Sequence, residues 1–259
     1  KIKIMRVNVI GSGYMGRQIT AILSIIGFDI LVWQKSNGNL TEEINKEIRK
    51  VEKILKLKSA GSVKIVNELH KLENNITIES VIENLEIKKK IFENLNYQEN
   101  LFSNTSSIKL SSIGKNINGF HFMNPVTIKL IEICKIGNFS QDKLNLILNE
   151  LKRISYDVMD VVDSPGYMIN KILFKDISFF FYLIEKENFR ADEVKKIYLD
   201  NLKHSDPIKL VNLIGVDTCL HILINLNKYD NQYYIPKMLR DSVKLNILGN
   251  KNKTRFKVL

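Results

Sequence analysis

A strand, a glycine-rich turn and a helix follow one another within residues 6–26, and this succession constrains the fold more than any other feature. Residues 6–10 read RVNVI, a short β-branched strand, and the turn GSGYMG comes directly after it. Apolar residues then recur at helical spacing as far as Ile26, Gly27 marks the end of the helix, and FDILVW follows as a second strand. Strand, helix and strand in this order form a βαβ unit, which predicts a parallel sheet.

The turn matches the pattern G-x-G-x-x-G in the context that the pattern requires, after a strand and at the start of a helix. Gly11 permits the tight turn, Gly13 lets the backbone approach a pyrophosphate, and Gly16 lets the helix pack closely on the sheet. The amino end of the helix offers free N–H groups and positive dipole to phosphates. We therefore expect Gly11, Gly13, Tyr14, Met15 and Gly16 to bind a dinucleotide.

The end of the second strand departs from this pattern. An acidic residue is expected there, about 20 residues beyond the turn, to bind the ribose 2′-hydroxyl of NAD. The chain has Gln34 instead, followed by Lys35 and Ser36. A glutamine can accept a hydrogen bond but carries no charge to repel a 2′-phosphate, and Lys35 would attract one. NAD is the favoured cofactor, and NADP remains open.

The remaining chain divides into two parts near residue 164. Residues 41–73 are polar and periodic, and predict a helical hairpin broken at 60–62. Further strands are predicted at 76–82, 100–106, 118–123, 128–134 and 157–162, and helices at 85–96 and 141–153. Beyond Ser164-Pro165-Gly166 only apolar-periodic helical stretches follow, at 167–187, 191–202, 207–227 and 236–247. We predict an α/β, Rossmann-type doubly wound domain at 1–164 and a smaller all-α domain at 165–259.

The composition is that of a globular protein, with 44% hydrophobic and 26% charged residues among 259. No apolar run approaches the roughly 20 residues of a membrane span, and the amino end has no signal-peptide pattern. Cys134 and Cys219 make neither a disulfide framework nor a metal-ligand cluster. We expect a cytoplasmic protein with no membrane contact and no metal.

The formal net charge of +11 has two interpretations. Lysine, isoleucine and asparagine are abundant throughout, as a nucleotide-composition bias would produce, and lysines alternate with glutamates as on a solvated helix face. The alternative is an anionic partner, such as cofactor phosphates, coenzyme A or an acidic carrier protein. A nucleic-acid partner is not expected, because no basic cluster or recognisable binding module is present.

One histidine stands inside an apolar run. Residues 119–132 read GFHFMNPVTIKLIE, with His121 between aromatic residues and Glu132 at the end of the next apolar stretch. Taken alone, a histidine in such surroundings is more often a core residue than a catalyst.

Five segments, in order along the chain, make the sequence resemble the 3-hydroxyacyl-CoA dehydrogenase family. They are GSGYMG (11–16), VIENLEIKKKIF (81–92), SNTSSI (103–108), HFMNPV (121–126) and DSPGYMINKIL (163–173). The resemblance implies a Rossmann-type domain with an inserted helical hairpin, followed by a small helical domain that dimerises. It also implies an NAD-dependent oxidoreductase of fatty acid metabolism that acts on a 3-hydroxyacyl thioester.

The resemblance assigns a role to each matching residue of the catalytic set. His121 would be the general base, and Glu132 the carboxylate that orients it. Ser106 and Asn170 would hydrogen-bond the reacting oxygen; Ser107 adjoins Ser106 and is an alternative by one place. Oxidation of an alcohol removes a hydride from carbon and a proton from oxygen, and a histidine beside a carboxylate suits the proton transfer.

The resemblance also places side chains at the cofactor. Glu83 and Lys88 would lie along the nicotinamide and its ribose, and Asn104 and Asn124 would support the site.

The second domain departs from the family's pattern. SDPIKL (205–210) lacks a glycine and a carboxylate of the corresponding motif, and GNKNKTRFKV (249–258) has Lys253 and Arg255 in place of two glycines. An intact catalytic set with an altered periphery leaves two alternatives to a coenzyme A substrate. One is a hydroxyacyl group tethered to an acyl carrier protein, whose acidic surface would suit the basic chain. The other is a non-catalytic structural or binding relative, which decay at the catalytic positions would indicate; such decay is not seen.

Overall fold

The structure, a computed structural model, describes residues 5–35 and 39–258, and the chain divides into two compact units, Lys1–Ser164 and Pro165–Leu259. The first unit contains a single eight-stranded sheet with the order β3-β2-β1-β4-β5-β6-β7-β8. The strands are β1 (Arg6–Ile10), β2 (Asp29–Trp33), β3 (Val63–Val66), β4 (Thr77–Glu79), β5 (Leu101–Ser103), β6 (Ile117–Phe122), β7 (Leu130–Cys134) and β8 (Asp157–Asp160).

All neighbouring strands run parallel except β6 and β7, which are antiparallel. The strand order reverses between β1 and β4, and such a switch point in a doubly wound sheet opens a crevice at the carboxyl ends of the strands. The predicted α/β class and Rossmann-type topology are confirmed.

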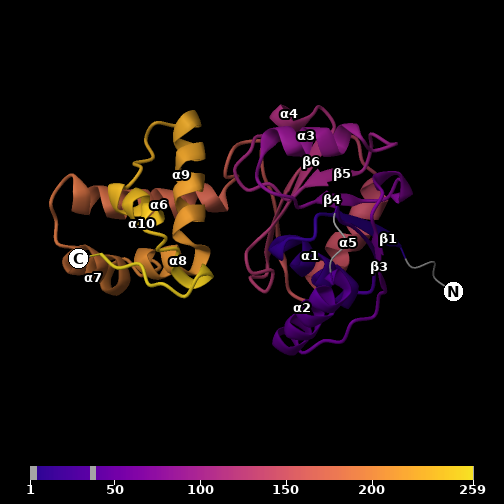
Figure 1. Cartoon of the computed structure of the whole chain (residues 1–259), viewed down its shortest axis with the longest axis horizontal. Helices are drawn as coiled ribbons and strands as arrows, with labels where there is room; N and C mark the ends of the chain where they lie inside the picture. Colours follow the sequence, from indigo (N-terminus) through magenta and orange to yellow (C-terminus); the bar gives the residue numbers. More distant parts are fainter. Residues whose placement is uncertain (1–4, 36–38, 259) are drawn as a thin grey trace. The chain divides into compact units, whose positions relative to one another are not determined.

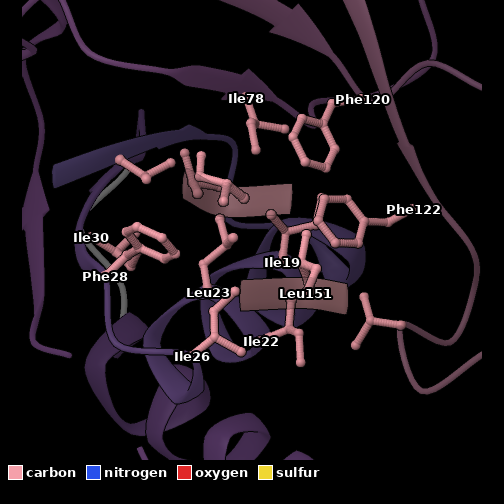
Figure 2. Close-up of a cluster of buried hydrophobic side chains, with 14 of the residues drawn as sticks. Ile19, Ile22, Leu23, Ile26, Phe28, Ile30, Ile78, Phe120, Phe122 and Leu151 are labelled. Atoms are coloured by element: carbon pink, nitrogen blue, oxygen red, sulfur yellow. The ribbon is translucent and has the colours of Figure 1, made fainter. Parts of the chain in front are cut away.

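Helices cover both faces of the sheet (Figure 1): α3 and α4 lie on one side, and α1 and α5 on the other. Their bounds are α1 (Tyr14–Ile25), α2 (Leu40–Leu55), α3 (Leu85–Glu93), α4 (Leu110–Ile113) and α5 (Gln141–Arg153). The main core fills the space between the sheet and the α1 side, where apolar residues of α1 and α5 meet Phe120 and Phe122 (Figure 2). Residues of one strand alternate between faces, so His121 points to the other side of the sheet.

The predicted helical hairpin at residues 41–73 is wrong in its second half. Only α2 is a long helix, and it ends at Lys56 in the left-handed conformation, φ 57°. Beyond it, β3 pairs in parallel with β2, and a short 3₁₀ turn, η1, follows at Leu69–Lys71. The segment VKIV alternates apolar and polar residues as an edge strand does, and its apolar side chains Val63 and Ile65 pack on the core.

The second unit contains only helices among its described residues, as predicted: α6 (Ile169–Glu185), α7 (Ala191–Lys196), a π-helical turn η2 (Ile197–Asn201), α8 (Pro207–Ile214), α9 (Val216–Tyr229), α10 (Lys237–Lys244) and the 3₁₀ turn η3 (Gly249–Lys251). The single helix predicted at 207–227 is broken, because Gly215 adopts φ +104° between α8 and α9. The two helices diverge by 103° there. Aromatic residues of α6 form the centre of this unit's core, which Phe174, Phe180 and Phe181 share with α9.

In the described part of the chain, no single helix has the length and apolarity to span a membrane, although α8 and α9 taken together pass that test by length and composition.

Candidate active site

The glycine turn lies at the carboxyl end of β1, at the switch point of the sheet. Gly11 has φ +109°, and a Cβ there would lie 2.6 Å from the carbonyl oxygen of Ser80, which follows β4. A Cβ on Gly16 would lie 2.0 Å from the carbonyl oxygen of Gly11. A Cβ on Gly13, in contrast, would meet nothing within 4 Å. Two glycines are therefore required by the protein's own packing, and the third faces open space that a ligand can fill.

The amino end of α1 lies beside that open space. Gly13 is its N-cap, no side chain caps the helix, and its first turn contains no acidic residue. Backbone N–H groups and the positive end of the helix dipole are thus available to an anion. Tyr14 is 46% exposed, and Met15 is partly buried against the core. The free N–H groups and the uncapped helix end suit a pyrophosphate.

No carboxylate occupies the end of β2. The backbone N–H of Gln34 donates to the carbonyl oxygen of Val66 in β3, 3.1 Å away, and the residue is 7% exposed. Lys35 is exposed, and Ser36 lies outside the described residues. Among the described residues, the end of β2 is consequently neutral to basic.

His121 and Glu132 face each other across the antiparallel ladder of β6 and β7. Their Cα atoms are register partners, and Nδ1 of His121 lies 2.8 Å from Oε2 of Glu132. Both side chains are buried, with 5% and 1% of their residue surfaces exposed. Because Phe120 and Phe122 point into the core on the α1 side of the sheet, His121 is not part of that apolar cluster. The predicted contact between the imidazole and the carboxylate is present.

The turn after β5 carries Ser106 and is held by Glu83. Oε1 of Glu83 accepts hydrogen bonds from the Thr105 hydroxyl at 2.7 Å, the Ser106 N–H at 3.0 Å, and both the N–H and hydroxyl of Ser107 at 2.9 and 3.0 Å. Ser107 is 2% exposed, whereas Ser106 is only partly buried. Of the two serines, the more accessible Ser106 is the better candidate for contact with a substrate.

Lys88 is buried and paired with two carboxylates, and its predicted contact with a cofactor stays a prediction. Its side chain is 1% exposed. Its Nζ atom lies 2.8 and 3.0 Å from the two carboxylate oxygens of Glu79 and 3.3 Å from Oε2 of Glu83. Burial lowers the pKa of an ammonium, but the two carboxylates outweigh it and raise the pKa of Lys88 above its ordinary value.

Glu79 is a member of this site that sequence reasoning missed. It is the last residue of β4, is fully buried, and also accepts from the Ser103 hydroxyl at 2.6 Å and the Val81 N–H at 2.6 Å. The available signal was a single carboxylate in the predicted strand ITIES.

Asn104 connects this turn to the strand of His121. Its side-chain oxygen accepts from the Phe122 N–H at 2.8 Å, and its own N–H donates to the Glu79 carbonyl oxygen at 2.7 Å. Asn124, exposed, precedes Pro125 through a cis peptide bond. The parallel strands β4, β5 and β6 therefore bring Glu79, the Ser106 turn and His121 to one edge of the sheet.

Asn170 belongs to the second unit. It lies in the first turn of α6, and its backbone N–H donates to the carbonyl oxygen of Gly166 at 3.2 Å. Gly166 adopts φ +80°, so the segment before α6 needs a glycine there.

Comparison with known proteins points to one family. Residues 6–164 match the family described as "3-hydroxyacyl-CoA dehydrogenase, NAD binding domain". A probable 3-hydroxybutyryl-CoA dehydrogenase of Deinococcus radiodurans is 26% identical, over 97% of this chain and 99% of its own. The mitochondrial hydroxyacyl-coenzyme A dehydrogenase of Sus scrofa is 26% identical, over 90% of this chain and 83% of its own. In fold, the crystal structure of (S)-3-hydroxybutyryl-CoA dehydrogenase from Ralstonia eutropha is similar, with a TM-score of 0.79, 23% identity and 99% of both chains covered.

Proposed function

Because the chain belongs to the 3-hydroxyacyl-CoA dehydrogenase family, we propose that it interconverts a 3-hydroxyacyl thioester and the 3-oxoacyl form, with His121 and Glu132 as the acid/base pair. The first unit binds NAD, which supplies the hydride acceptor when it is bound. The observation that carries the proposal is the 2.8 Å contact between the His121 ring and the buried Glu132 carboxylate.

The pair is arranged for proton transfer. In oxidation, a C–H and an O–H bond of the substrate break and a C=O bond forms; the hydride needs an acceptor, which bound NAD would supply, and the proton needs a base. Glu132 engages Nδ1, which favours the tautomer with its proton there and directs Nε2 to accept the substrate proton. The imidazolium then has Glu132 as its counter-ion, in a place with little solvent to stabilise it otherwise.

Neutral donors complete the catalytic set. Ser106, in the turn after β5, and Asn170, in α6 of the second unit, would hydrogen-bond the reacting oxygen and stabilise its partial negative charge. The pattern of exposure in the turn supports Ser106 over Ser107.

The cofactor site draws on the glycine turn and on its neighbours. Gly11, Gly13, Tyr14, Met15 and Gly16 would surround the pyrophosphate, with Gly13 making the closest approach. Gln34 and Lys35 would lie at the adenosine ribose, and Glu83, Lys88 and Asn104 would support the nicotinamide half. We favour NAD over NADP, and the neutral Gln34 makes the discrimination weaker than an acidic residue would.

A titration tests the cofactor and the substrate class together. NADH and NADPH are each added to the purified protein and followed by nicotinamide fluorescence, and acetoacetyl-CoA is then added with the better-bound one. We expect tighter NADH binding and oxidation of NADH on addition of acetoacetyl-CoA. Absence of nicotinamide binding would contradict an enzymatic function and favour a structural or binding relative.

One observation favours a second candidate, a hydroxyacyl group carried on an acyl carrier protein. The last described segment has a basic row, Lys251, Lys253, Arg255 and Lys257, whose exposed cations alternate with more buried side chains. Lys251 is paired with Asp217 at 2.9 Å, whereas the other three form no ion pair with a described residue. Phe256 fixes the row, since it is 2% exposed and exchanges backbone hydrogen bonds with the Asn212 side chain at 2.9 and 3.0 Å. Such a row complements an acidic carrier surface.

The two candidates separate when one acyl group is presented on both carriers. A carrier-protein substrate predicts that replacing Lys253, Arg255 and Lys257 by glutamate raises KM for the protein-bound thioester and leaves the coenzyme A thioester unaffected. Replacement of Lys53 and Lys56, at the end of α2, by glutamate is the control, because it also reverses positive charges but at another place on the surface. The carrier protein would be excluded if the coenzyme A thioester is turned over at least as fast as the protein-bound one and the glutamate replacements change neither rate.

We further propose a homodimer formed by the second unit. Ile172 and Phe179, seven residues apart on one face of α6, are 58% and 51% exposed, and a partner copy would cover them. Light scattering on the intact chain and on Phe179→Glu is the test; a monomeric wild type contradicts the proposal.

A further inference from the structure

A chain of buried charges leads from the end of β4 to the turn that carries Ser106. Ser103 donates to Glu79, both oxygens of Glu79 contact Lys88, and Lys88 reaches Glu83. Glu83 then accepts four hydrogen bonds from the turn. Each member contacts the next, and three of them bear a formal charge.

The two oxygens of Glu83 have separate partners. Oε1 faces the turn and accepts from Thr105, Ser106 and Ser107, while Oε2 faces the Lys88 ammonium 3.3 Å away. Successive backbone N–H groups that converge on one anion form a nest, which fixes the local backbone. The position of the Ser106 backbone thus depends on the Glu83 carboxylate being present and correctly oriented.

Lys88 orients the Glu83 carboxylate, and Glu79 offsets the free-energy cost of burying the Lys88 ammonium. An ammonium with 1% exposure is strongly destabilising unless it is paired, and Glu79 contacts it through both oxygens. Lys88 in turn helps to keep Glu83 charged: burial raises the pKa of Glu83, but Lys88 and the hydrogen bonds from the turn lower it below its ordinary value. A carboxylate, unlike a carboxylic acid, accepts from every partner at once.

We infer that Glu83 is a positioning residue that sets the place of Ser106 through the turn, with Lys88 and Glu79 as its buried support. This inference rests on the proposed function insofar as Ser106 contacts the reacting oxygen. It gives Glu83 and Lys88 a task in holding the turn, in addition to their proposed place beside the nicotinamide half, and it adds Glu79 to the residues on which the reaction depends.

Glu83→Gln is the primary variant, because the amide has nearly the shape of the carboxylate but presents its NH₂ group to one of the two sets of partners. If its oxygen faces the turn, its NH₂ group faces Lys88, a donor against a donor; the flipped amide presents donors to the turn. We expect kcat to fall roughly 10–100-fold from misplacement of Ser106, a larger factor than any loss of NADH affinity. A tenfold loss of NADH affinity with kcat preserved would overturn the inference and make Glu83 a cofactor ligand.

A double-variant cycle identifies the route of the effect. Ser106→Ala alone is expected to lower kcat roughly 10²–10³-fold. If Glu83 acts through Ser106, adding Glu83→Gln to Ser106→Ala costs much less than it costs in the wild type. Losses that multiply within about twofold would overturn the inference. Glu86→Gln, an exposed glutamate of α3 paired with Lys89 at 3.4 Å, is the matched control and is expected to change nothing.

Hydrogen exchange tests the positioning independently of any activity. Peptides covering residues 103–109 are expected to exchange faster in Glu83→Gln than in the wild type, and peptides from α5 at an equal rate. Should Glu83→Gln not fold, Thr105→Val removes one of the four hydrogen bonds to Glu83 without touching a charge, together with the one that the Thr105 hydroxyl accepts from the Ile108 N–H. Faster exchange of the Ser106 and Ser107 amides, smaller in size, is then expected. Unchanged exchange at 103–109 in the folded variant would overturn the inference. If the wild type does not turn over acetoacetyl-CoA, but Glu83→Gln still exchanges faster than the wild type at 103–109, the proposed function is contradicted and the inference about the turn is not.

Discussion

Two buried clusters of ionisable side chains lie at the same edge of the sheet, and they are built differently. His121 and Glu132 come from facing positions of one antiparallel ladder, and strand register alone brings them together. Glu79, Glu83 and Lys88 come from a strand end, a loop and a helix, and are held by several hydrogen bonds each. The first cluster has a ring that can gain or lose a proton. In the second, Lys88 has a raised pKa and Glu83 a lowered one, so these two side chains keep their charges. The difference teaches that one cluster is suited to moving a proton and the other to holding a backbone in place.

The largest effect is expected from removing the ring that exchanges the proton. His121→Ala should lower kcat roughly 10²–10⁴-fold, because a positioned general base contributes that much. NADH affinity should stay close to that of the wild type, since the glycine turn is intact. Steady-state kinetics and a fluorescence titration measure the two quantities. Normal turnover would contradict the assignment of His121, and lost NADH affinity would indicate a wider structural change.

Removing the central cation of the other cluster should instead affect stability. Lys88→Met leaves the buried Glu79 and the partly exposed Glu83 without their ammonium, and breaking the buried Glu79–Lys88 pair from one side costs about 3–5 kcal/mol. Denaturant unfolding measures this free energy. Lys89→Met, on the same helix with an exposed partner, should cost less than about 0.5 kcal/mol. Equal losses in the two variants would show that the Lys88 cluster does not hold this edge together.

The same contrast explains what could be predicted from the sequence. The glycine turn is one contiguous motif, whereas His121 and Glu132 stand on two neighbouring strands and were assigned by the family resemblance. Glu79 and Lys88 are nine residues apart on different elements, and only folding shows that they meet. The edge strand β3 was missed because VKIV is four residues long and its apolar positions also suit a helix. The break at Gly215 depends on a positive φ that hydrophobic periodicity cannot report.

Variants of the glycine turn separate an effect on ligand binding from an effect on packing, and the expected changes are smaller. Gly13→Ala adds a methyl group to open space, so unfolding free energy should change by less than about 0.5 kcal/mol. NADH affinity should fall about tenfold, because the methyl group occupies the place where the backbone approaches the pyrophosphate. Gly16→Ala is the matched variant: its Cβ would lie 2.0 Å from the Gly11 carbonyl oxygen, so both stability and affinity should fall. Unchanged NADH affinity in Gly13→Ala would place the pyrophosphate elsewhere.

The smallest expected effect is the pH dependence that Glu83 confers on stability. Its pKa in the folded protein is below the ordinary 4.5: burial alone raises it, while Lys88 and the hydrogen bonds of the turn lower it more. The folded state therefore binds fewer protons than the unfolded state, and the stabilisation is fully present above about pH 4.5 and is lost as pH falls through the folded pKa. The difference in unfolding free energy between wild type and Glu83→Gln should shrink from about pH 7 to about pH 3.5 in urea titrations. The change should be modest, because the Glu83 side chain is 24% exposed and solvent screens it. A difference that stays constant with pH would mean that Glu83 holds the turn through shape and hydrogen bonding, with no contribution from its charge.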